Sequence, residues 1–169
     1  MPDAEFAPEE IVGVLASHGV AFVLIGGFAA WVQGSPIPTE DVDIVPAADR
    51  DNYARLSAAL TELDAHVRAE GVEPQPFSHD ADSLAAARIW NLTTKFGDLD
   101  ITAQPAGTQG YADLRRDALT ITLRGVDVQL ASLADIVRSK EAAGRDKDRR
   151  ALPVLRELVA RQLRERRGR

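Results

Sequence analysis

The chain has 169 residues, of which 45% are hydrophobic, 5% are aromatic and none is cysteine, a composition that suits one domain with its own core. The absence of cysteine excludes a disulfide-stapled secreted scaffold. No apolar run approaches the roughly 20 residues that cross a bilayer, and the N-terminal stretch MPDAEFAPEE is acidic where a secretion signal is basic. We therefore expect a cytoplasmic protein that does not bind a membrane.

The formal net charge of −6 conceals two parts of opposite sign. Residues 1–137 contain 8 basic and 21 acidic residues, whereas residues 138–169 contain 12 basic and 5 acidic ones. The net charge alone argues against a protein that binds nucleic acid electrostatically over most of its surface. The two parts need separate explanations, and the basic part is either a surface that faces RNA or a solvated helix face.

The first third of the chain predicts alternating helices and strands. A helix that starts near Pro8 ends at Gly19, and the apolar run VAFVLI predicts a buried strand. GGFAAWVQG has helix-forming composition, SPIPT is irregular because of its two prolines, and DVDIV alternates as a strand does. A helix with Asp49 as its N-cap follows, and its apolar residues recur at helical spacing up to Leu63.

The remainder is less regular. Residues 64–88 have the composition of a loop, with one or two helical turns in SLAAAR. Residues 89–94 and 98–103 predict a hairpin, and LTITLRGVDVQLAS predicts a second strand pair after the short helical piece YADLRRDA. Two helices end the chain, from Leu133 to Gly144 with Ser132 as cap and from Leu152 to Arg166.

This order of elements predicts an α/β (α+β) fold, with a mixed sheet of four or five strands flanked by helices. We divide the chain into a core of residues 1–130 and a C-terminal helical segment of residues 131–169, which packs on the core and ends in a basic frayed tail.

Gly26 and Gly27 stand where the predicted buried strand runs into a helix. Adjacent glycines let backbone amides approach a ligand closely, and a helix start presents free N–H groups that favour phosphate. The alternative is a tight turn with no ligand.

Asp41 and Asp43 lie two residues apart on a predicted strand, so their carboxylates share one face while the intervening apolar residues face the core. Carboxylates held side by side on a partly buried strand repel each other unless a cation lies between them, and Mg²⁺ suits such oxygen ligands. The alternative is an exposed strand edge with solvated acids. The segment FGDLDIT supplies a third acid, Asp98 or Asp100, and three carboxylates could hold two metal ions for a phosphoryl displacement.

The glycine pair that opens a helix, the acid-apolar-acid-apolar pattern of residues 41–44 and a later strand acid resemble the nucleotidyltransferase superfamily that includes DNA polymerase β. The short chain and the piece SKEAAGRDKDRRAL look like its minimal members, especially the AbiEii and MenT type of toxin from toxin and antitoxin pairs. Where related sequences often carry an arginine between the turn and the acids, this chain has Ile37 and Pro38.

The resemblance implies a role for each matching residue. Gly26 and Gly27 would hold the phosphates of a nucleoside triphosphate such as ATP, and Asp41, Asp43 and Asp100 would be the metal-binding acids, with Asp98 as the alternative third. Lys140 would contact the triphosphate, with Arg145 and Asp148 supporting it. Lys140 is one of only three lysines among 20 basic residues. Mg²⁺ would be the cofactor, in a site for up to two ions, with Mn²⁺ as a substitute.

The function implied is transfer of a nucleoside monophosphate from a triphosphate to an acceptor hydroxyl. The toxin resemblance favours tRNA as the acceptor and an antitoxin protein as a partner. Two alternatives stay open: a nucleotidyltransferase that modifies a small molecule, as the aminoglycoside and lincosamide enzymes do, and a non-catalytic relative that acts by protein association.

Among the other residues, Trp31 and Trp90 are expected to be core anchors. None of the three histidines has a partner at metal-ligand spacing.

Overall fold

The computed structural model describes residues 5–169, so the first four residues of the acidic N-terminal stretch lie outside it. Within the described chain the helices are α1 (Pro8–Ser17), α2 (Gly26–Val32), α3 (Arg50–Glu62), α4 (Ala81–Ala86), α5 (Tyr111–Arg116), α6 (Leu133–Ala143) and α7 (Asp146–Arg167). The strands are β1 (Phe22–Ile25), β2 (Asp41–Pro46), β3 (His66–Ala69), β4 (Val72–Pro76), β5 (Ile89–Thr94), β6 (Gly97–Thr102), β7 (Leu119–Leu123) and β8 (Val126–Leu130).

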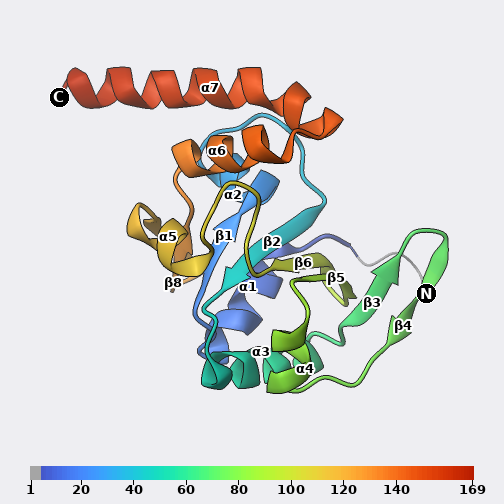
Figure 1. Cartoon of the computed structure of the whole chain (residues 1–169). Helices are drawn as coiled ribbons and strands as arrows, with labels where there is room; N and C mark the ends of the chain where they lie inside the picture. Colours follow the sequence, from blue (N-terminus) through green and yellow to red (C-terminus); the bar gives the residue numbers. More distant parts are fainter. Residues whose placement is uncertain (1–4) are drawn as a thin grey trace.

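All of these strands belong to one mixed sheet, in the order β4-β3-β5-β6-β2-β1-β8-β7. Figure 1 shows the central strands β1 and β2 with β6 beside them. β2 lies at its centre, antiparallel to β1 and parallel to β6. The hairpins β5–β6 and β7–β8 form as the sequence predicts. The predicted class is confirmed, but the prediction of four or five strands is wrong, because the sheet in residues 5–169 has eight.

The predicted number of strands is too low partly because residues 64–88 are interpreted as a loop. Residues 64–88 contain β3, β4 and α4. Every residue of the edge strand β4 is exposed, and the strand includes Pro74 and Pro76. A strand without a buried face shows no apolar alternation, so its pattern cannot be distinguished from that of a loop.

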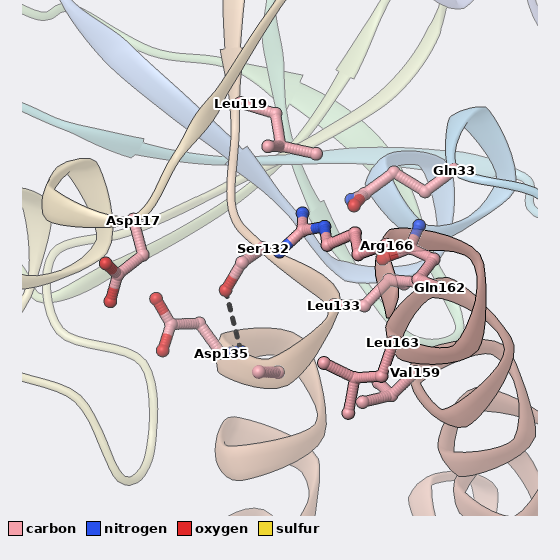
Figure 2. A pocket seen from close by; sticks show the side chains of 11 residues that line it. Gln33, Asp117, Leu119, Ser132, Leu133, Asp135, Val159, Gln162, Leu163 and Arg166 are labelled. Atoms are coloured by element: carbon pink, nitrogen blue, oxygen red, sulfur yellow. Dashed lines mark hydrogen bonds between the residues drawn. The ribbon is translucent and has the colours of Figure 1, made fainter. Parts of the chain in front are cut away.

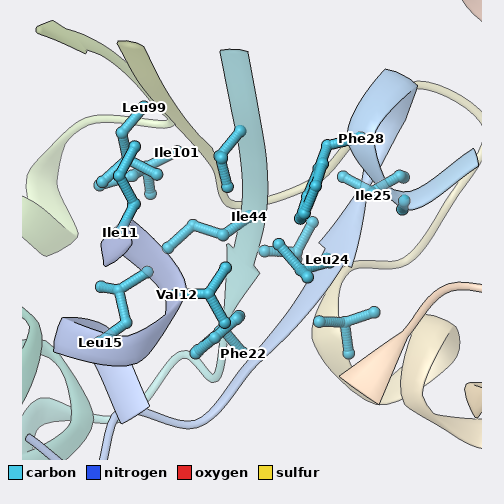
Figure 3. Close-up of a cluster of buried hydrophobic side chains, with 14 of the residues drawn as sticks. Ile11, Val12, Leu15, Phe22, Leu24, Ile25, Phe28, Ile44, Leu99 and Ile101 are labelled. Atoms are coloured by element: carbon cyan, nitrogen blue, oxygen red, sulfur yellow. The ribbon is translucent and has the colours of Figure 1, made fainter. Parts of the chain in front are cut away.

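The hydrophobic core includes buried residues of the sheet and of the helices around it, and the part where α1 packs on the sheet is drawn in Figure 3. Ile44 and Leu99 of the central strands are fully buried there, together with Ile11 and Leu15 of α1. Because side chains alternate along a strand, the residues between these apolar ones, Asp43 among them, point to the opposite face. Core packing thereby fixes which face carries the acids.

Two of the predicted helix caps are present. The Asp49 side chain accepts a hydrogen bond from Asn52 N at the start of α3, and the Ser132 side chain accepts one from Asp135 N at the start of α6. The last helix begins at Asp146, six residues before the predicted Leu152. Its first turn is polar and carries no apolar periodicity, which is why the pattern missed it.

The two tryptophans differ in how deeply they are buried. Trp31 is 51% exposed, so the expectation that it anchors the core is wrong; its ring stacks on Phe28 with centroids 6.2 Å apart. Trp90 is partly buried against the core, and its ring stacks on Phe77. In residues 5–169 we find no helix with the length and apolar character needed to span a membrane.

Candidate active site

The turn between β1 and α2 comes very close to the central strand. Gly26 has a φ of +76°, and a Cβ built on it would lie 2.3 Å from Oδ2 of Asp43. A side chain at this position would therefore collide with the carboxylate, and its backbone conformation would be strained as well. Gly27 is also tight, since its Cβ would lie 3.2 Å from Oγ1 of Thr39. The glycine pair brings the backbone of the turn against an acidic side chain.

Strand pairing gathers the acids. In the parallel ladder of β2 and β6, Asp41 lies opposite Asp98 and Asp43 lies opposite Asp100. Asp41, Asp43 and Asp100 each offer a carboxylate oxygen, and these three oxygens lie within 4.8 Å of one another. The structure thus brings together the two acids of β2 with one acid of β6.

Asp98 has other partners. Its Oδ1 accepts a hydrogen bond from Thr93 Oγ1 at 2.9 Å, and its Oδ2 lies 3.4 Å from Nη1 of Arg68. Of the two acids that the sequence left open, Asp100 is the one that joins the cluster.

The cluster is electrostatically strained. Burial raises the pKa of Asp43 to about 7, with further increases from the negative charges of Asp41 and Asp100. Lys147 and Lys140 oppose this rise in pKa. Burial also raises the pKa of Asp100, against the lowering effect of its hydrogen bond from Arg68. Raised pKa values of this origin fall when a cation binds between the carboxylates.

The three acids line one wall of a cleft. The opposing wall is basic and comes from the junction of α6 and α7. Asp148, which is fully buried, accepts a hydrogen bond from Nε of Arg145 at 2.7 Å, and its Oδ1 lies 3.4 Å from Nζ of Lys140. Burial alone would raise the pKa of Asp148, but Arg145 and Lys140 outweigh it and hold the pKa below its usual value. The buried carboxylate thereby fixes two cations at the rim of the cleft.

One cleft of about 740 Å³ joins both walls. Its lining includes Gly26, Gly27, the three clustered acids, Lys140 and Arg145, so most of the predicted site residues meet there. Asp148 is not among the lining residues and lies beneath them.

Some residues of the cleft were missed from the sequence. Lys147 lines the basic wall, and the scarcity of lysine could have pointed to it. Ile89 and Asn91 line the side of β5, where a strand pattern gives no sign of a ligand. Arg68 does not line the cleft but contacts Asp98 and Asp100 beside it, and it lies in the segment interpreted as a loop.

A second, smaller cavity of about 310 Å³ lies between the N-terminal end of α6 and the C-terminal half of α7 (Figure 2). It is lined by Ser132 and Asp135 from the start of α6 and by Leu163 and Arg166 from α7. None of the predicted site residues lines this cavity, so the chemistry is concentrated in the larger cleft.

No family model and no curated protein sequence matches the chain. Several solved structures are similar to the chain in fold. The lincosamide antibiotic adenylyltransferase LnuA, with lincomycin bound, has a TM-score of 0.60 at 13% identity, over 91% of this chain and 99% of that one. A candidate nucleotidyltransferase from Thermotoga maritima has a TM-score of 0.55 at 17% identity, over 89% and 94%. ANT(2″)-Ia in complex with adenylyl-2″-tobramycin has a TM-score of 0.50 at 14% identity, over 86% and 83%. The chain therefore has the nucleotidyltransferase fold.

Proposed function

We propose that the protein is a metal-dependent nucleotidyltransferase, which transfers a nucleoside monophosphate from a nucleoside triphosphate to an acceptor hydroxyl. The observation that carries this proposal is a single cleft in which three clustered carboxylates face a wall of fixed cations. A binding module gains nothing from a partly buried acidic cluster that destabilises its own fold.

The acids fit a divalent cation of the Mg²⁺ type. The donor set consists of carboxylate oxygens alone, which is the chemistry that Mg²⁺ and Mn²⁺ prefer. Asp41, Asp43 and Asp100 would hold the ion or a pair of ions, which would neutralise charge on the transferring phosphoryl group and activate the attacking hydroxyl.

The rest of the cleft would position the triphosphate. Gly26 and Gly27 line the cleft together with the carboxylates, and the backbone of Gly26 comes close to Asp43, where the phosphates must come to meet the cation. Lys140 and Arg145, held by Asp148, and Lys147 would bind the terminal phosphates that leave as pyrophosphate. In the reaction the acceptor oxygen forms a bond to the α-phosphorus as the bond to pyrophosphate breaks, and the hydroxyl proton passes to solvent. The protein contributes alignment and charge neutralisation.

Two acceptor classes each have an observation in their favour. The basic face of α7, with Arg161, Arg164 and Arg167 exposed, favours an RNA acceptor such as the 3′ end of tRNA, as for a toxin with a cognate antitoxin. The neutral wall of the cleft formed by Ile89, Asn91 and neighbouring residues favours a small hydroxylated molecule of the kind bound by the antibiotic adenylyltransferases. We place tRNA first, because the exposed arginines extend well beyond the cleft.

The test is to incubate the purified protein with each α-labelled triphosphate, Mg²⁺ and one acceptor, either total tRNA or a panel of aminoglycosides and lincosamides. We expect label to move to one acceptor class, and to be lost in Asp41→Ala and Asp43→Ala. The carboxylate control is Asp127→Asn, an exposed acid on β8.

Failure of transfer to every acceptor, together with no shift in melting temperature on adding Mg²⁺ and triphosphate, would contradict the proposal. That result would favour the non-catalytic relative, since a ligand that binds the native state raises its melting temperature by mass action.

A further inference from the structure

Arg68 reaches the acidic cluster from a strand that lies one strand away from β6. It belongs to β3, which pairs with β5, and β5 pairs in turn with β6 (Figure 1). The pairing of β3 with β4 shifts register between Val67 and Ala69, which is where Arg68 stands. Val67 pairs with Leu92, whose side chain is buried in the core, so Arg68 lies on the opposite face of the sheet and extends over β5 to the acids of β6.

The guanidinium is held at three points. Nη1 donates to the carbonyl oxygen of Leu92 at 2.6 Å and lies 3.4 Å from Oδ2 of Asp98. Nη2 donates to Oδ1 of Asp100 at 2.7 Å. The arginine side chain is 29% exposed and that of Asp100 is 17% exposed, so water screens this pair only in part. One guanidinium thus neutralises Asp98 and engages an acid that also belongs to the cluster of three.

We infer that Arg68 is the internal counter-ion of the acidic cluster, which stabilises the cluster in the metal-free protein and competes with the incoming cation for Asp100. This inference rests on the metal site of the proposed function. A positive charge beside a cation site opposes binding of the cation by Coulomb repulsion, and Nη2 already occupies one Asp100 oxygen. Arg68 therefore weakens metal binding and, by the same charge, stabilises the metal-free protein.

Removing the positive charge of Arg68 and removing the negative charge of Asp98 should have opposite effects on Mn²⁺ binding. Arg68→Met keeps much of the volume and removes the positive charge, and it should tighten Mn²⁺ binding about tenfold. Asp98→Asn removes a negative charge from the same group of contacts and should weaken Mn²⁺ binding several-fold. Arg68→Lys keeps the charge and should stay within about threefold of the wild type. A purely structural role for Arg68 would weaken Mn²⁺ binding in Arg68→Met and Asp98→Asn alike.

The experiment is a Mn²⁺ titration of the full chain, followed by electron paramagnetic resonance of the free ion and without nucleotide. The matched control is Arg50→Met, which removes an exposed arginine paired with Asp82. The melting temperature in EDTA gives a second readout: Arg68→Met should lower it, and added Mn²⁺ should raise it by more than in the wild type.

Unchanged or weaker Mn²⁺ binding in Arg68→Met, with the wild type binding normally, would overturn the inference and leave the proposed function intact. Absence of Mn²⁺ binding in the wild type, or binding that survives Asp43→Asn, would overturn both. If Arg68→Met does not fold, Arg68→Lys and Asp98→Asn still decide: equal weakening of Mn²⁺ binding in both would contradict the counter-ion role.

Discussion

The two walls of the cleft are built in different ways. The acidic wall lies on β2 and β6, adjacent strands in the interior of the sheet, and its three carboxylates are placed by strand parity and register. The basic wall lies where α6 ends and α7 begins, and it is organised by the buried Asp148, which contacts both Lys140 and Arg145. The comparison shows one cleft whose acids are fixed by backbone pairing and whose cations are fixed by one side chain.

This difference predicts different responses to mutation. Removing one carboxylate of the acidic wall leaves the ladder of β2 and β6 intact, so chemistry should be lost while the fold is kept. Removing the carboxylate beneath the basic wall leaves the partly buried Lys140 and the exposed Arg145 without their shared partner, so stability and binding should fall together.

The largest effect should come from Asp43→Asn, which keeps the shape of the side chain and removes one charge from the acidic wall. We expect nucleotidyl transfer to fall about 10³-fold, because the transition-state charge loses its stabilisation. The metal-free variant should be at least as stable as the wild type, since a repelled charge has been removed. Initial rates and urea denaturation measure the two effects, with Asp127→Asn as control. A variant that is inactive because it is unfolded would contradict the expected separation.

The same residue should make stability depend on pH. The folded-state pKa of Asp43 is raised to about 7 from its ordinary value of 3.8, so its contribution to stability is present at low pH and is lost as the pH rises through about 7. Relative to Asp43→Asn, the metal-free wild type should lose up to about 4 kcal/mol of unfolding free energy between pH 4 and pH 8. Urea denaturation in EDTA at several pH values measures this gap. A difference in unfolding free energy between the two proteins that does not change with pH would show that the pKa of Asp43 is not raised in the folded state.

On the basic wall, Asp148→Asn should lower the unfolding free energy by about 3 kcal/mol, because Lys140 and Arg145 lose their buried partner. The Michaelis constant for the triphosphate should rise as well. The matched control is Asp146→Asn in the same helical turn, whose side chain is 87% exposed and which should change the unfolding free energy by less than about 0.5 kcal/mol. Equal stabilities of the two variants would show that Asp148 does not organise the wall.

The smallest effect concerns α7 beyond the cleft. Replacing Arg161, Arg164 and Arg167 with glutamine should weaken tRNA binding several-fold at low salt and reduce its salt dependence, because fewer phosphates are neutralised. Triphosphate binding should not change, since none of these residues lines the cleft. Filter binding over a range of salt concentrations measures the effect. Unaltered tRNA binding would identify these arginines as a solvated helix face and would favour the small-molecule acceptor.

The sequence by itself determined much of the acidic wall. Apolar residues alternate with Asp41 and Asp43, and this parity places the two acids on one face whatever lies around them. The glycine pair predicted the tight strand-to-helix turn, and its positive φ and close approach to Asp43 explain why glycine stands there. These features are local, so a short pattern is enough to reveal them.

Only the tertiary structure decided between Asp98 and Asp100. The two share one face of β6 and both contact Arg68, but Thr93 donates a hydrogen bond to Asp98, while Asp100 lies opposite Asp43 and within reach of Asp41. The same holds for the role of Asp148 beneath the basic wall and for β3, which carries Arg68. Contacts between residues far apart in the chain leave no periodic signal in the sequence, and the exposed edge strand β4, which pairs with β3, leaves none either. Parity within one strand can therefore be predicted from the residues alone, whereas the partner of each charge is fixed only by the pairing of the strands and the packing of the helices.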